Sequence, residues 1–184
     1  MKKIAIIVTA VLVAGALIGA LLLRSNVSEP AAAMTPVWSE VAWPFPMDQW
    51  GKGKAFVCKA AHCGTDVTVY IRAKIGFCNC ATGVADDEEL DRISDFDLFG
   101  NKLTALGPGQ PIAVAWMKGR SRAYTIGEPR AKKSALSVGF NDRCDAIVAT
   151  ATLTHDRPTA VEPAVLEFLN SKTVLRWAEV TLGL

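Results

Sequence analysis

Histidine is scarce in this chain, with two in 184 residues, and the motifs of the common hydrolases and nucleotide-binding proteins are absent. The sequence contains no G-x-S-x-G, H-E-x-x-H, P-loop or G-x-G-x-x-G motif, each of which places a nucleophile, a metal ligand or a phosphate-binding turn. His62 is next to Cys63, but neighbouring side chains on an extended chain point to opposite sides. His155 and Cys144 fall on one predicted strand, where they would stand about 36 Å apart. We therefore name no catalytic residue, and an enzyme is the less favoured class.

A large excess of charge of one sign is also lacking. The formal net charge is +2, and three of the 20 Lys+Arg but none of the 18 Asp+Glu lie in residues 1–24. The rest of the chain therefore carries a net charge of about −1. It has no excess of positive charge from which to build the broad basic face that attracts nucleic acids. We expect no nucleic-acid partner.

One long apolar run, residues 4–23, contains no charged residue and no proline. At about 1.5 Å of rise per residue, a helix of this length spans about 30 Å, the thickness of the hydrocarbon core of a bilayer. Lys2 and Lys3 precede the run. The positive-inside rule then puts the N-terminus in the cytoplasm and the rest of the chain on the periplasmic side. The alternative is a cleaved signal peptide, which would release a periplasmic or secreted protein.

The apolar run divides the chain into three predicted parts. Residues 1–24 form the anchor of a single-pass inner-membrane protein, or its signal sequence. Residues 25–35 are a small, polar, proline-containing linker. Residues 36–184 form one exported domain, since this length is sufficient to bury a core.

The exported part begins with an aromatic and proline-rich segment, residues 36–54. Its prolines disfavour regular helix and central strand, so we expect an extended arm. The tryptophan rings of this arm either pack over an edge of the core or dock a partner. The candidate binding residues, from the arm and the strand that follows it, are Trp38, Trp43, Trp50, Tyr70 and Arg72.

Strand patterns dominate the rest of the chain. In residues 66–75 apolar side chains alternate strictly with polar ones, which indicates a strand with one buried face and an outer face shared by Tyr70, Arg72 and Lys74. Further strands are predicted at 54–59, 111–119, 121–126, 134–140, 144–153 and 173–182.

Two helices are predicted. One covers residues 159–169, where Thr159 and Glu162 have the spacing of a capping box. The other begins at Asp86 or Asp87, where a run of acidic residues favours a first helical turn and lacks the register of a calcium loop. The predicted fold class is therefore α+β: an N-terminal membrane helix followed by one antiparallel β-sheet domain with one or two helices packed on it.

Four of the five cysteines lie within residues 58–80 and resemble a metal site at first sight. The strand predicted between Cys63 and Cys78 would be about 33 Å long, whereas bonds from zinc to sulfur are about 2.3 Å. The cluster therefore divides into two halves at opposite ends of the strand. We expect no metal ion bound by the whole cluster, and no cofactor.

Disulfides are the default for paired cysteines outside the cytoplasm. We predict a bond between Cys58 and Cys63, which flank a short turn. Either one of Cys78 and Cys80 bonds Cys144 and the other stays free, or both are reduced. A C-x-C pair also suits thiol exchange or Cu(I) binding, with Cys78 and Cys80 as the alternative metal ligands.

These observations favour a membrane-anchored envelope protein whose exported domain binds a protein or small-molecule partner and does no chemistry. Residues 4–23 would bind the membrane itself. The alternative is a thiol-redox or copper-handling factor that uses Cys78 and Cys80. A hydrolase whose site is not visible in the sequence is the weakest hypothesis.

Overall fold

The computed structural model describes residues 35–100, 103–127, 133–153 and 157–184. The predicted anchor, nearly all of the linker and His155 lie outside the described residues. The strands within them are β1 (Trp38–Val41), β2 (Lys54–Cys58), β3 (Val67–Lys74), β4 (Leu103–Ala105), β5 (Gln110–Val114), β6 (Met117–Ile126), β7 (Lys133–Asp142) and β8 (Asp145–Leu153). The helices are α2 (Ala60–Cys63), α3 (Asp87–Ile93), the 3₁₀ helix η1 (Phe96–Phe99), α4 (Pro158–Leu169) and α5 (Lys172–Leu182).

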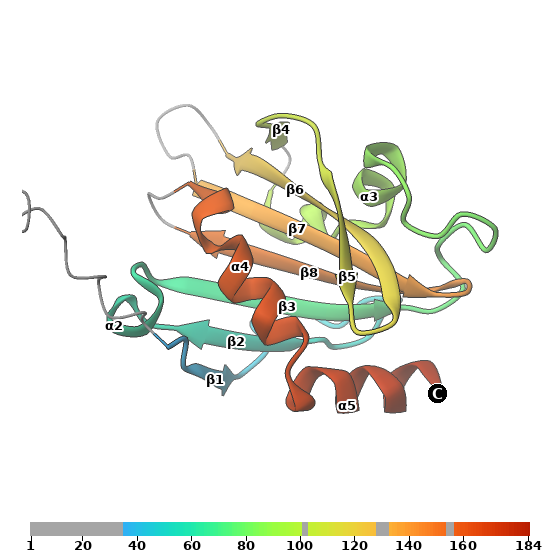
Figure 1. The fold of residues 1–184 in the computed structure, drawn as a ribbon, viewed down its shortest axis with the longest axis horizontal. Helices are drawn as coiled ribbons and strands as arrows, with labels where there is room; N and C mark the ends of the chain where they lie inside the picture. The colour runs from blue at the N-terminus through green and yellow to red at the C-terminus, as the bar shows by residue number, and fades with distance from the viewer. Residues whose placement is uncertain (1–34, 101–102, 128–132, 154–156) are drawn as a thin grey trace, which may run out of the picture. The chain divides into compact units, whose positions relative to one another are not determined.

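All strands belong to one antiparallel sheet with the order β1-β2-β3-β8-β7-β6-β4 (Figure 1). The two short strands β4 and β5 share the outer edge of β6: β4 pairs with its last residues and β5 with its first. The prediction of an α+β fold built on one antiparallel sheet is confirmed, although more helices accompany the sheet than the one or two expected.

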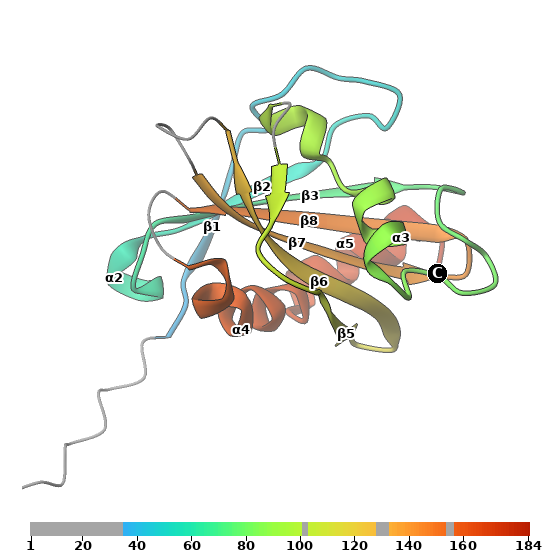
Figure 2. The same cartoon turned by 90° about the horizontal axis from the view of Figure 1, so that it is seen from above.

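The two faces of the sheet are covered by different elements. Helices α4 and α5 lie on one face and α3 on the other (Figure 2). The face under α4 and α5 carries the larger core, in which Val69, Ile71 and Val138 are fully buried. The face under α3 carries a smaller apolar cluster that includes Leu90 and Ile93 of that helix.

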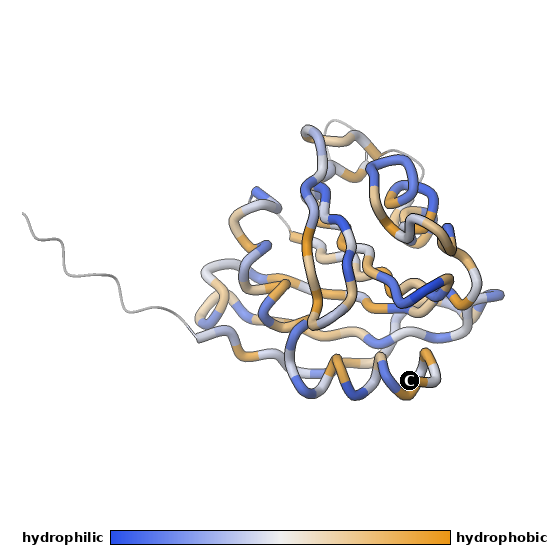
Figure 3. Tube along the Cα trace, turned by 45° about the vertical axis from the view of Figure 1, so that its right-hand side comes forward, coloured by the Kyte–Doolittle hydropathy of each residue, from blue (hydrophilic) through white to orange (hydrophobic). Residues whose placement is uncertain are grey.

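Residues 173–182, predicted as a strand, form most of α5, so that prediction is wrong. Local capping accounts for the helix. The Ser171 side chain accepts a hydrogen bond from the Val174 N–H, and Gly183 closes the last turn in the left-handed conformation, with φ 71°. Val174 and Ala178, four residues apart, turn one face into the core, and apolar and polar residues alternate along the helix in Figure 3. These caps and this spacing outweigh the β-branched content of the segment.

Two smaller predictions also need correction. Residues 111–119 are not one strand, because a turn with Ala115 at φ 51° separates β5 from β6. The predicted capping box does not form: α4 begins at Pro158, one residue earlier than expected, and its N-cap Arg157 makes no side-chain cap hydrogen bond. Glu162 is thus left to make another contact, which is described below.

The alternation predicted in β3 is present, but its outer face is not open to solvent. Val67, Val69 and Ile71 are buried as expected. On the opposite face the exposed fractions of Arg72 and Lys74 are only 1% and 4%, because that face is covered too. Ile75, predicted on the buried face, lies beyond the end of β3 and is 54% exposed.

Candidate functional site

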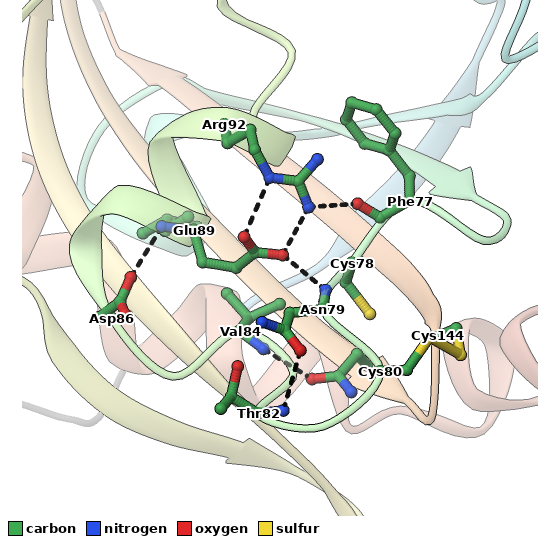
Figure 4. A network of polar contacts seen from close by, with 12 residues as sticks. Phe77, Cys78, Asn79, Cys80, Thr82, Val84, Asp86, Glu89, Arg92 and Cys144 are labelled. Carbon is green, nitrogen blue, oxygen red and sulfur yellow. Dashed lines mark hydrogen bonds and ion pairs between the residues drawn. A yellow bond between two sulfur atoms is a disulfide. The ribbon is translucent and has the colours of Figure 1, made fainter.

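The cysteines form two disulfides, one near each end of β3. Cys58 and Cys63 are bonded with an S–S distance of 2.03 Å and join the end of β2 to the short helix α2. Cys80 is bonded to Cys144 and joins the loop after β3 to the turn between β7 and β8 (Figure 4). Cys78 remains free. The first pairing is the one predicted from the sequence, and the second is one of the alternatives that the sequence left open for Cys78, Cys80 and Cys144.

The free thiol of Cys78 lies in a buried and electronegative position. Its backbone N–H donates to the Cys144 carbonyl oxygen at 3.1 Å, and its sulfur lies 3.2 Å from the Arg143 carbonyl oxygen. Burial raises the pKa of Cys78, and the carboxylates of Glu89 and Asp145 raise it further. Since the thiolate is the reactive form, this position disfavours thiol exchange and metal binding by Cys78.

The loop that carries Cys78 is held by α3. The side chain of Glu89 accepts a hydrogen bond from the Asn79 N–H at 2.8 Å and pairs with Arg92, whose guanidinium also donates to the Phe77 carbonyl oxygen (Figure 4). Asp86 caps α3 by accepting from the Glu89 N–H, as the acidic run predicts. Among the described residues, no group of three or more His, Cys, Asp or Glu side chains is placed to hold a metal ion.

Tryptophans of the arm pack against the domain. Trp38 stacks on Phe168 of α4 with 4.6 Å between ring centroids, and Trp50 lies at the same distance from Phe77. Trp43 makes an edge contact with Tyr70. These tryptophans are each partly buried, so they cover edges of the domain and also retain some surface for a partner.

The fifth candidate binding residue, Arg72, lies in a buried ion-pair network under the arm. Its guanidinium donates to both carboxylate oxygens of Asp95 and, at 2.6 Å, to Asp48 of the arm. Lys74 lies 2.9 Å from the same Asp95 carboxylate. Burial opposes ionisation of Asp48, but the hydrogen bonds from Arg72 and from the Trp50 N–H, together with the positive charges of Arg72 and Lys74, outweigh it and lower the pKa of that carboxyl. The network holds the arm against the sheet.

A hollow that the sequence did not predict lies beside the start of α4. This α4 hollow has a volume of about 330 Å³, and its walls are the first turns of α4, the β4–β5 connection and the adjacent face of β6. A second, more open hollow of about 590 Å³ shares Pro108, Thr159 and Glu162 with it. Glu162 thus lines both hollows.

Glu162 is the chemically distinctive group of this hollow. It is only 6% exposed and accepts a hydrogen bond from the Ser121 hydroxyl on β6. Within the part of the chain that the structure describes, it forms no ion pair. One sequence signal marks this residue: Glu162 interrupts the apolar stripe of Val161, Val165 and Leu169 on the buried side of α4.

The wall of the hollow opposite α4 is fixed by hydrogen bonds. The Leu106 N–H donates to the Ala123 carbonyl at 2.9 Å, and the Arg122 guanidinium donates to the Gly107 carbonyl at 2.8 Å. The Gly109 N–H donates to the carboxylate of Asp87 on α3. The hollow is therefore formed before any ligand binds, which lowers the entropic cost of binding.

No protein-family model matches this chain, and no curated protein matches its sequence. In the described parts of the chain, no helix has both the length and the apolar character needed to cross a bilayer. The predicted span, residues 4–23, lies outside them.

Proposed function

We propose that this chain is a membrane-anchored envelope protein whose exported domain binds a small molecule in the α4 hollow without transforming it. Residues 4–23 hold it in the inner membrane with the domain on the periplasmic side. The observation that carries the proposal is a preformed, mainly apolar hollow whose lining includes one buried acidic residue, Glu162. Small-molecule sites have this composition: an apolar lining with a few polar groups that fix orientation.

The arrangement of Ser121 and Glu162 also bears on whether the hollow is a catalytic site. The serine hydroxyl is only 1% exposed and is engaged with the carboxylate. His62 is an exposed residue of α2 and does not line the hollow. Acyl transfer would need Ser121 as a nucleophile with a base such as histidine to activate it. Because His62 is not in the hollow, ligand binding explains the hollow better than acyl transfer does.

The disulfides lend less support to the redox alternative. Cys80 is bonded to Cys144 and not to its C-x-C neighbour, and the pKa of the remaining thiol is raised. A thiol-exchange protein needs an accessible thiolate. Cys80 and Cys144 instead join two loops at one end of the sheet, which is a structural role.

An NMR fragment screen on the labelled full-length chain in detergent micelles tests the proposed function. Small amphipathic fragments are expected to shift the amide signals of Ala123, Thr159 and Glu162. Thr159→Trp places a bulky side chain on the lining and should abolish these shifts. The matched control is Ala160→Trp, which changes the next exposed residue of α4 but does not line the hollow. Fragments that bind Thr159→Trp unchanged, or that bind only elsewhere, would overturn the proposal.

A further inference from the structure

We infer that the α4 hollow selects a ligand with an apolar body and a positively charged amine, and that Glu162 binds the amine. The inference rests on the proposed function and specifies the chemical class of its ligand. It is carried by the burial of Glu162, by the limited set of partners around its carboxylate, and by the apolar walls on either side.

The carboxylate has unused hydrogen-bonding capacity. An ionised carboxylate accepts about four hydrogen bonds, and the described residues supply Glu162 with one, from a neutral hydroxyl. Buried charges in proteins are normally paired with an opposite charge or bound to a metal. Other carboxylates of this domain follow that rule: Asp95, which is 4% exposed, is paired with both Arg72 and Lys74. Glu162 departs from this pattern at the point where its side chain lines a hollow.

The helix itself does not compensate the charge of Glu162. Favourable interaction of an acidic side chain with the helix dipole is confined to the first turn. α4 begins at Pro158, so Glu162 is the fifth residue of the helix and lies beyond that turn. A ligand that brings a positive charge and N–H donors supplies what the helix does not.

The two arginines that line the hollow do not neutralise Glu162, so its carboxylate remains available to a cationic ligand. Arg122 is engaged with Asp91 at 3.0 Å, with Asp87 at 3.6 Å and with the Gly107 carbonyl, so its charge is already balanced. Arg157 is exposed at the start of α4, where solvent and salt screen its charge. Neither is within ion-pair distance of Glu162 in the described structure.

The rest of the lining suits an apolar body. Leu136 is buried behind the hollow, Pro158 is buried at the start of α4, and Leu106 stands at the rim with 54% of its surface exposed. Covering Leu106 with a ligand removes apolar surface from water and so favours binding. The amine thus gives orientation, and the apolar body gives additional affinity.

The test compares butylamine, 1-butanol and butyrate, three ligands of matched length, by NMR titration of the full-length chain in micelles at neutral pH. We expect butylamine to shift the Glu162 and Ser121 signals with a dissociation constant roughly tenfold to hundredfold below that of 1-butanol, as a charged hydrogen bond contributes. Butyrate should bind least. Glu162→Gln keeps the size of the side chain and should remove the preference for the amine. Glu167→Gln, the same change at an exposed position of α4, should leave it intact.

The outcomes separate the inference from the proposed function. If 1-butanol or butyrate binds in the hollow as tightly as butylamine, the ligand class is wrong while the hollow remains a binding site. If none of the three ligands and none of the screened fragments shifts the signals of the hollow, both are wrong. The comparison of the three ligands needs no substitution, so it decides the question even if Glu162→Gln does not fold.

Discussion

Replacing Asp95 by Asn should destabilise the domain more than any comparable change at a surface carboxylate. Asp95 is 4% exposed and is the shared partner of Arg72 and Lys74, which are 1% and 4% exposed. The amide keeps the shape of the side chain but removes the negative charge. Lys74 then has no carboxylate partner among the described residues, and Arg72 keeps only Asp48, on the outer side of the network.

The size of the effect follows from the burial of the two cations. Breaking a buried ion pair by removing one partner costs about 3–5 kcal/mol, because an uncompensated charge remains in the interior. In a domain of this length each kcal/mol lowers the melting temperature by about 2–4 °C, so we expect a decrease of roughly 6–20 °C. The control is Glu40→Gln, which removes the partner of Lys54 in an exposed pair and should cost at most about 1 kcal/mol.

Thermal unfolding of the full-length chain, followed by near-ultraviolet circular dichroism, measures both variants. A decrease for Asp95→Asn that matches the decrease for Glu40→Gln would refute the reasoning, since it would mean that the buried cations do not depend on Asp95. Substituting Arg72, Lys74 and Asp95 together by apolar residues should recover part of the lost stability, because no stranded charge is then left in that position.

Two further predictions concern the cysteines. The loop-closure entropy that a disulfide removes from the unfolded chain increases with the number of residues enclosed. Replacing Cys80 and Cys144 by Ala should therefore lower the free energy of unfolding by about 4 kcal/mol, and replacing Cys58 and Cys63 by about 2 kcal/mol. Chemical denaturation measures both values, and the reverse ranking would contradict the entropic account. Because burial and nearby carboxylates raise the pKa of Cys78, its thiol should react slowly with iodoacetamide at pH 7.5 in the native protein and fully in denaturant. Mass spectrometry measures the extent of alkylation. Rapid alkylation of the native protein would restore the thiol-exchange hypothesis.

Local patterns in the sequence were sufficient for the strand at the centre of the sheet and for the division of the cysteines into two groups, but not for the choice of Cys80 over Cys78 as the partner of Cys144. The strict alternation in residues 66–75 identified β3 and its buried face, and the distance along that strand separated the cysteines into two groups. Both conclusions depend on residues that are close in sequence. The wrong prediction at α5 also has a local origin, because the strand pattern of residues 173–182 takes no account of Ser171 and Gly183, which cap the helix at its two ends.

The α4 hollow could not be predicted in the same way. Its opposing walls come from the β4–β5 connection and from α4, which are far apart in the sequence and meet only because β6 and β7 bring them together. The pattern around Glu162 was read as a capping box, which is a local explanation for an acidic residue near a helix start. The stripe of buried neighbours on the same face of α4 was the signal that this carboxylate points inward.

The two faces of the sheet are coupled through Asp87, and this coupling bears on binding. Asp87 belongs to α3 on one face, yet its carboxylate accepts from the N–H of Gly109, which follows the lining residue Pro108, and from Arg120 of β6. Burial opposes its ionisation, but the hydrogen bonds from Arg120 and from the Gly109 N–H, together with the positive charges of Arg120 and Arg122, outweigh that cost and lower the pKa of Asp87. The carboxylate is therefore ionised throughout the neutral range, and the wall weakens only as the pH falls through that lowered pKa. The hollow thus keeps its shape throughout the neutral range, in which an alkylamine carries its positive charge, and this is the range in which selective binding of an amine is to be tested.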